Sequence, residues 1–293
     1  MSYPWSDLST KDEMKLSVCI STHPASFDAV PLKGDFTSNV SLAKQIGFDG
    51  VELAIRDPRL INKDSMLRLV FDAGLEIPAI ATGQAWGEEG LSFTDPDPAI
   101  RQAAINRVKL HIDFSKDIKA LIIIGLLRGK IKPGIDFSRA YEWMFSAFSD
   151  CCAYAEKNDV RIAFEPINRY ETSLLNTIED SLIFIEKIGS KNLGLLIDSF
   201  HMNIEEPSIE KSISLAKDRI FHFHYADSNR RYPGAGHLNF SSILDVLDSI
   251  GYSGYLSGEH RSDLNPEHAV RQGFLTISGI LKESKERKKI TTN

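Results

Sequence analysis

Arg161-Ile-Ala-Phe-Glu165 and Leu193-Gly-Leu-Leu-Ile-Asp198 are short apolar runs that each end in a carboxylate. Two later runs, Ile220-Phe-His-Phe-His224 and Tyr255-Leu-Ser-Gly-Glu259, end in an imidazole and a third carboxylate. Continuous apolar runs of this length are typical of strands buried on both faces of a parallel sheet. A metal-binding side chain at the end of such a strand lies where a (β/α)8 barrel builds its active site. These four segments therefore predict a barrel that carries a divalent-metal site.

The rest of the chain repeats the same alternation of strand and helix. The expected strands are 16–22, 50–55, 77–82, 120–125, 161–167, 193–198, 220–227 and 255–260, with amphipathic segments at 40–47, 65–74, 98–116, 138–158, 177–189 and 240–251. Eight alternations favour a closed (β/α)8 TIM barrel over a doubly wound open sheet, because no Gly-x-Gly-x-x-Gly follows the first strand. We expect one barrel domain at 15–284, an N-terminal extension at 1–14 and a C-terminal tail at 285–293.

Composition excludes several classes of protein. The 293 residues carry a net charge of −6, and the only basic cluster lies at 282–289, so nucleic acid is a poor candidate for the substrate. No apolar stretch approaches the roughly 20 residues that cross a bilayer, and residues 1–14 lack the pattern of a signal peptide, so we expect a cytoplasmic protein without a membrane partner. Cys19, Cys151 and Cys152 are expected to be buried, reduced thiols.

The four strand-end residues form a coherent set of metal ligands. Glu165, Asp198, His224 and Glu259 offer oxygen and imidazole donors, which suit Mn²⁺ best and also Co²⁺, Mg²⁺ or Zn²⁺. His222 lies two residues before His224 on the same face of its strand, so we expect it one layer deeper, as a hydrogen-bonded neighbour of the site. No organic cofactor is expected.

The segments around these residues resemble those of the ketose 3-epimerases of the tagatose/psicose 3-epimerase family, which belong to the xylose-isomerase-like barrel superfamily. Glu165-Pro-Ile-Asn-Arg-Tyr-Glu171 is similar to the family's Glu-x-x-Asn-Arg-x-Glu segment, and Asp198-Ser-Phe-His201-Met-Asn-Ile-Glu-Glu to its Asp-x-x-His-x-Asn-x-Glu-Glu. His224-Tyr-Ala-Asp-Ser-Asn-Arg230, followed by Pro233-Gly-Ala-Gly236, is similar to its His-x-x-x-x-Asn-Arg…Pro-Gly-x-Gly. The resemblance extends from about residue 15 to the last helix.

The resemblance implies an activity and a set of roles. The four strand-end residues would bind the metal, and Glu171, His201 and Arg230 would hold the O1 and O2 end of a sugar. Segments 54–58, 82–85 and 124–129 are similar to a branch that acts on keto-uronates such as 5-keto-gluconate and tagaturonate. Related barrels often pair, so we expect a homo-oligomer.

The expected reaction is epimerisation of a ketose or keto-uronate at the carbon next to the carbonyl, through a metal-bound cis-enediolate. Glu165 and Glu259 are the candidate acid/base pair, one for each face of that carbon. Arg56 and Arg128 follow the second and fourth strands and would bind the carboxylate of a sugar acid, although pairing with Asp57 or Glu88 is an equal alternative. In the loop after strand three, Trp86 is a candidate to close over the substrate, or a packing residue.

Three rival functions remain open. An aldose–ketose isomerase, or one of hydroxypyruvate type, would use the same metal and the same two glutamates. An apurinic endonuclease of the same superfamily is disfavoured, since a cluster of metals needs more well-placed histidines than the eight present, together with a basic groove. A non-catalytic binding barrel would not require ligands on four separate strands.

Overall fold

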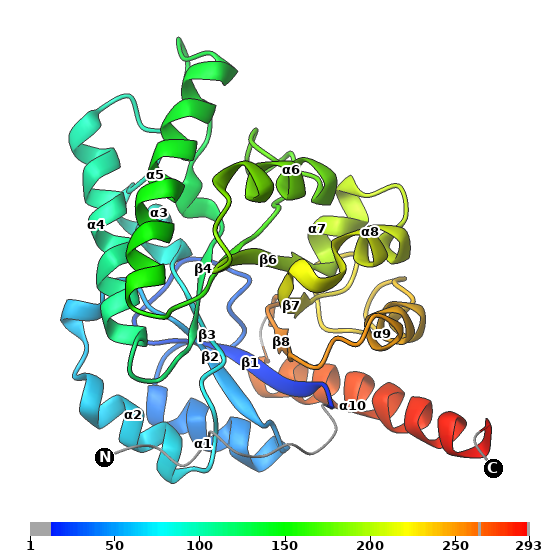
Figure 1. The fold of residues 1–293 in the computed structure, drawn as a ribbon. Coiled ribbons are helices and arrows are strands. Elements are labelled where there is room, and N and C mark those ends of the chain that lie inside the picture. Colours follow the sequence, from blue (N-terminus) through cyan, green and yellow to red (C-terminus); the bar gives the residue numbers. More distant parts are fainter. Residues whose placement is uncertain (1–12, 263–264, 292–293) are drawn as a thin grey trace.

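The computed structural model describes residues 13–262 and 265–291, and its centre is a closed barrel of parallel strands (Figure 1). The strands are β1 (Lys15–Ser21), β2 (Gly50–Ala54), β3 (Ala79–Ala81), β4 (Leu121–Ile124), β5 (Ile162–Phe164), β6 (Leu193–Asp198), β7 (Ile220–Tyr225) and β8 (Tyr255–Gly258). Each strand pairs in parallel with the next along the chain, and β1 closes the ring on β8. The predicted (β/α)8 barrel is confirmed.

Helices surround the barrel and join its strands (Figure 1). They are α1 (Phe36–Ile46), α2 (Lys63–Asp72), α3 (Gly83–Glu89), α4 (Pro98–Ser115), α5 (Phe137–Lys157), α6 (Ile178–Ile188), α7 (Ser199–Glu205), α8 (Ile209–Ala216), α9 (Phe240–Ser249) and α10 (Pro266–Thr291). Three 3-10 turns lie at Pro58–Leu60, Leu126–Arg128 and Lys217–Arg219. All six helices expected from the amphipathic pattern are present.

Short polar signals fix where several helices begin and end. At the start of α1, the side chain of Asp35 accepts a hydrogen bond from the backbone N–H of Ser38, and Thr177 makes the equivalent bond to Asp180 at the start of α6. Gly47 ends α1 with φ +111°, a left-handed conformation that favours glycine. These caps return the chain to the next strand within a few residues.

Side chains point alternately to the inside and the outside of the barrel along each strand, and this separates two hydrophobic cores. In β4, Leu121 and Ile123 belong to a small cluster inside the barrel, whereas Ile122 and Ile124 pack outwards in the large core beneath the helices. That outer core includes aromatic contacts such as Phe148 against Phe164, with ring centroids 5.4 Å apart. Because both faces of each strand are buried, the strands read as continuous apolar runs in the sequence.

Some expectations about segments need correction. Residues 83–90 were expected to form a loop, but 83–89 are the helix α3, and Trp86 lies within it. The last helix, α10, runs to Thr291, so the predicted C-terminal tail, 285–293, is helical as far as residue 291. Most of the predicted N-terminal extension, residues 1–12, lies outside the described residues. Across the described parts of the chain, no helix is both long and apolar enough to cross a bilayer.

Candidate metal centre and active site

The barrel brings the four predicted ligands together at the carboxyl ends of its strands. Glu165 follows β5, Asp198 is the last residue of β6, His224 is the fifth residue of β7, and Glu259 follows β8. One ligand atom from each lies within 4.8 Å of the others, and all four side chains are buried. Four donors from four separate strands can converge in this way because neighbouring parallel strands end at the same rim of the barrel.

The bonding of these residues fits a divalent cation. Asp198 accepts a hydrogen bond of 2.7 Å from the backbone N–H of Phe200 with one oxygen, while its other oxygen, Oδ2, is buried without a hydrogen-bond partner among the described residues. Nδ1 of His224 is likewise buried and unpartnered, 3.5 Å from Oε2 of Glu259. Buried lone pairs without partners are rare in proteins, and a cation bound between these two side chains would satisfy both atoms. Carboxylate oxygens with one imidazole suit Mn²⁺, Co²⁺, Mg²⁺ or Zn²⁺.

The electrostatics of the cluster agree with this fit. Burial raises the pKa of Glu165 well above its ordinary value, and the carboxylate of Glu259 adds to the effect. Burial also raises the pKa of Asp198, to about 7. A cation would reverse both shifts, because an adjacent positive charge favours the ionised carboxylate. Binding of a metal at this cluster would therefore release protons and weaken as the pH falls.

A buried chain of side chains lies behind His224. Oε2 of Glu52 accepts hydrogen bonds from Nε2 of His224 at 2.9 Å and from Nε2 of His222 at 2.8 Å. Although burial acts to raise the pKa of Glu52, the two imidazoles hold it below its ordinary value. An ionised Glu52 fixes Nε2 of His224 as a donor, so Nδ1 is the atom that would bind a cation in the cluster. Although burial acts to lower it, the carboxylates of Glu52 and Glu259 hold the pKa of His224 above its ordinary value while no cation is bound. The expectation that His222 lies one layer deeper agrees with this arrangement.

We predict that Glu52→Gln weakens Mn²⁺ binding about 10- to 100-fold, the usual cost of losing a carboxylate behind a ligating histidine. The amide no longer carries the charge that fixes the His224 tautomer. Isothermal titration of the metal-free protein measures the affinity. Glu76→Gln is the matched control, because Glu76 bonds Lys15 and Tyr255 away from the cluster. Equal Mn²⁺ affinity in Glu52→Gln and wild type would contradict the role of Glu52.

The three residues expected to hold the sugar's reactive end form one network beside the cluster. Nη1 of Arg230 donates to Oε1 of Glu171 at 2.7 Å, and Nδ2 of Asn168 donates to the same oxygen at 2.9 Å. Asn168 Nδ2 also lies 2.7 Å from Nδ1 of His201. The His201 Nε2 atom thus faces Glu165, with Oε1 at a distance of 3.7 Å. Asn168 therefore holds both His201 and Glu171 in place.

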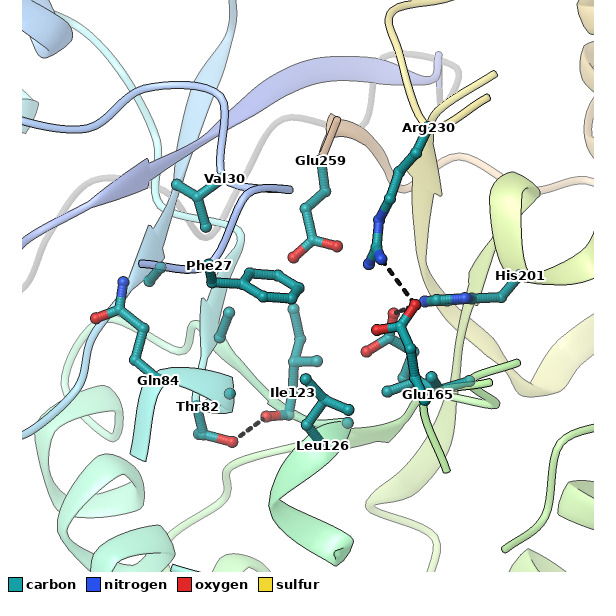
Figure 2. Close-up of a pocket in the computed structure, with 16 residues that line it drawn as sticks. Phe27, Val30, Thr82, Gln84, Ile123, Leu126, Glu165, His201, Arg230 and Glu259 are labelled. Carbon is teal, nitrogen blue, oxygen red and sulfur yellow. Dashed lines mark hydrogen bonds and ion pairs between the residues drawn. The ribbon is translucent and has the colours of Figure 1, made fainter. Parts of the chain in front are cut away.

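A cavity opens next to the cluster and has two unlike halves (Figure 2). Glu165, Glu259, His201 and Arg230 approach from one side in Figure 2, where the dashed line from Arg230 marks its bond to Glu171. The opposite side is largely apolar, with two polar side chains; its labelled residues are Phe27, Val30, Ile123, Leu126, Thr82 and Gln84. The polar half suits the hydroxyl and carbonyl groups that react, and the apolar half suits the remaining carbons.

The other three candidates for substrate binding are absent from the described residues that line this cavity. Arg128 is fully buried in the turn after β4, where its guanidinium donates to the backbone carbonyl of Glu165 and stacks on Phe164. Nε of Arg56 lies 3.5 Å from a carboxylate oxygen of Glu89, so an acidic partner is present, though not one of the two expected. Trp86 packs against the core, with Lys130 5.2 Å above its ring.

Gly125 provides a precise test of how Glu165 is placed. A Cβ at this position would collide with Oε2 of Glu165 and lie 3.1 Å from Cδ1 of Ile167. We expect Gly125→Ala to displace the carboxylate and to lower kcat/KM about 100-fold, the scale of a misplacement of roughly 1 Å. Steady-state kinetics on the best substrate measure the loss. Gly83→Ala is the control, since Gly83 also lines the cavity but has open space around it; equal activities in the two variants would refute the prediction.

Sequence reasoning missed most of the apolar half of the cavity. Phe27 and Val30 lie in the connection after β1, and their ordinary apolar character gave no signal of a role. Leu126 sits in the 3-10 turn after β4. The role of Asn168 was accessible, because the Glu-x-x-Asn-Arg-x-Glu motif includes it, but the motif pointed first to its two acidic residues.

Comparison with known proteins agrees with the fold. The structure defines the class of closed parallel (β/α)8 barrels, with a cluster of carboxylates and one imidazole at the carboxyl rim that could hold a metal. The profile of the family described as xylose isomerase-like TIM barrel matches residues 40–278. The chain belongs to this family, which confirms the superfamily expected from the motifs.

Several named relatives and solved structures are sugar epimerases. L-ribulose 3-epimerase of Mesorhizobium japonicum is 29% identical over 242 residues, which cover 82% of this chain and 80% of the relative. The 3-dehydro-D-guloside 4-epimerase of Escherichia coli is 33% identical over 230 residues, 74% of this chain and 84% of the relative. A structure of L-ribulose 3-epimerase superimposes with a TM-score of 0.79 at 23% identity, covering 94% of this chain and 98% of the other.

Proposed function

We propose that this protein is a ketose epimerase that inverts the carbon next to the carbonyl and depends on one divalent cation. The observation that carries the proposal is the pair Glu165 and Glu259, which follow β5 and β8 and both line one cavity beside the ligand cluster (Figure 2). Epimerisation requires proton removal on one face of a carbon and proton return on the other. Two carboxylates that reach one cavity from separate strands supply the two acid/base groups.

The cation would be held by Glu165, Asp198, His224 and Glu259, and it supplies Lewis-acid stabilisation of the negative charge that develops on the carbonyl and neighbouring hydroxyl oxygens. One glutamate takes the proton from the substrate carbon, and a cis-enediolate forms. The other glutamate then donates a proton to the opposite face. The two roles exchange in the reverse reaction, so each glutamate needs both protonation states.

Neighbouring side chains would orient the substrate. Arg230 is held by Glu171 and presents a fixed positive charge to the cavity, which suits an enediolate oxygen. Burial lowers the pKa of His201, so this residue acts as a neutral hydrogen-bonding group. Both residues line the cavity together with the two glutamates.

The known relatives support the class of substrate. The proteins with similar sequences are named as epimerases of ketoses and of a 3-dehydro-guloside, and one similar structure holds D-allulose. The apolar half of the cavity supports a neutral ketose. A carboxylate at the far end of the substrate would meet Phe27, Val30 and Leu126, while Arg56 and Arg128 lie outside the described lining.

The test is proton–deuterium exchange in D₂O with Mn²⁺ present, against a panel of neutral ketoses and keto-uronates, followed by product analysis. The proposal expects deuterium only at the carbon next to the carbonyl, together with the inverted sugar, and higher turnover of neutral ketoses. An aldose as the product would favour the aldose–ketose isomerase instead. Preference for tagaturonate-type acids would restore the role expected for Arg56 and Arg128. No exchange with any member of the panel would contradict the proposal.

A further inference from the structure

A third buried acid and a thiol lie next to the metal cluster. Cys19 of β1 and Glu52 of β2 are direct partners in the barrel register, so their side chains face the same way. One ligand atom from each lies within 4.8 Å of the other and of a carboxylate oxygen of Glu259. All three residues are at most 8% exposed. This second group overlaps the proposed catalytic centre at Glu259 alone.

One carboxylate oxygen of Glu52 is free to bind a cation. Its Oε2 accepts from both His222 and His224, but its Oε1 is buried and has no hydrogen-bond partner among the described residues. A carboxylate oxygen that is fully buried and unpartnered costs free energy. A cation bound by Oε1 would remove this cost and leave both histidine bonds intact.

We propose that Cys19, Glu52 and Glu259 form a second cation site, selective for thiophilic metals such as Zn²⁺ or Cd²⁺. Thiolate sulfur is a soft ligand that prefers these ions to Mn²⁺ or Mg²⁺. Zinc binds sulfur at about 2.3 Å and carboxylate oxygen at about 2.0–2.2 Å, so the three side chains need to close by roughly 1 Å around the ion. The Cys19 thiol gives up its proton to the solvent buffer as the metal–sulfur bond forms.

Occupation of this site inhibits the enzyme, an effect that rests on the proposed function. Glu259 belongs to both groups, so a cation beside Cys19 draws its carboxylate away from the catalytic cation and from the substrate carbon. Excess Zn²⁺ or Cd²⁺ therefore lowers the activity of the Mn²⁺-loaded protein. Cys19 does not line the cavity among its described residues, so its substitution leaves the basal activity unchanged.

The experiment titrates Cd²⁺ into the Mn²⁺-loaded protein and follows both activity and the ultraviolet thiolate-to-cadmium band. Wild type is expected to gain the band at one Cd²⁺ per chain and to lose activity in parallel. Cys19→Ser is expected to lack the band and to keep its activity at the same Cd²⁺ concentrations. Cys152→Ser is the matched control, because it removes another buried thiol, in α5, and should behave as wild type.

Three results would overturn the site: no band in wild type, a band that persists in Cys19→Ser, or a band lost in Cys152→Ser. Cys19→Ala replaces Cys19→Ser if the serine variant does not fold, as judged by its thermal melting. The absorption band reports Cd²⁺ binding to Cys19 even when no substrate is turned over. This result is therefore independent of whether the proposed function is correct. Inhibition that is equal in wild type and Cys19→Ser would show that Cd²⁺ acts only by replacing Mn²⁺.

Discussion

Glu259→Gln and Glu165→Gln are each expected to lower the rate of epimerisation by about 10²–10⁴-fold, the usual contribution of a positioned acid or base. An amide cannot take up the proton that a carboxylate removes from the substrate carbon. Both glutamates line the cavity and belong to the ligand cluster. Among the described lining residues the one other carboxylate is Glu171, which is paired with Arg230. The measurement is kcat for the conversion of one epimer into the other.

Isotope exchange separates this role from simple metal binding. Each variant keeps one working glutamate, which still removes and returns a proton on its own face. In D₂O, Glu259→Gln should therefore exchange the proton of one epimer only, and Glu165→Gln that of the other epimer only. Complementary exchange of this kind requires a bound metal and two bases on opposite faces.

The control is metal content, measured on the same samples at a saturating Mn²⁺ concentration. Variants that bind Mn²⁺ and exchange one epimer support the two-base mechanism. Exchange of both epimers by one variant would show that a single base serves both faces. Retained epimerisation in either variant would refute the assignment of that glutamate.

Removal of the metal is expected to abolish activity, and Mn²⁺ should restore it. In the metal-free protein, the buried carboxyl of Asp198 has its pKa raised to about 7, and Glu165 is shifted in the same direction. Asp198→Asn removes the negative charge of one ligand, and His224→Ala removes a ligand. Each should weaken Mn²⁺ binding by more than the roughly 10- to 100-fold loss expected for an outer partner such as Glu52. Isothermal titration on chelator-treated protein measures these affinities.

His111→Gln is the control for loss of a buried imidazole. His111 bonds the backbone carbonyls of Arg107 and Ile55, and it belongs to none of the described ligand groups. This variant should lose stability but bind Mn²⁺ as wild type does. Activity that survives complete chelation would contradict the proposed dependence on a cation.

The barrel could be predicted from sequence because its strands are buried on both faces. All eight predicted strands are present, and β6 has the predicted bounds. The predicted ends of the strands were less accurate where the strand is short. For example, β5 contains three residues, although 161–167 were expected. The apolar run at 161–167 continues beyond the last residue of β5, because Ile167 lines the cavity and not the strand pairing.

Three helices were missed for local reasons. The segment that forms α3 contains Gly83 and Gly87 and ends at Gly90, a glycine content typical of a loop. Thr82, at its start, makes no capping hydrogen bond that would have marked a helix. Asp198 is both the last residue of β6 and the cap of α7, so no connecting segment marked the change. The third missed helix, α8, is only eight residues long.

The ligands could be predicted from sequence because the ends of parallel strands all lie at one rim of the barrel. The positions of side chains in the turns could not be predicted in this way. Arg128 follows β4 closely, which suggested that it faces the substrate. Instead, the turn at 126–128 directs it beneath the backbone of Glu165, where burial lowers its pKa to about 9. Periodicity gives the face of a strand residue, whereas the direction of a turn residue depends on tertiary packing.

The central claim is that Glu165, Asp198, His224 and Glu259 hold one catalytic cation. Anomalous diffraction at the manganese edge, from a crystal of the Mn²⁺-loaded protein, tests it most directly. We expect a single strong peak bonded to one atom of each of the four side chains. A map without density there, or with manganese bound only elsewhere, would contradict the claim.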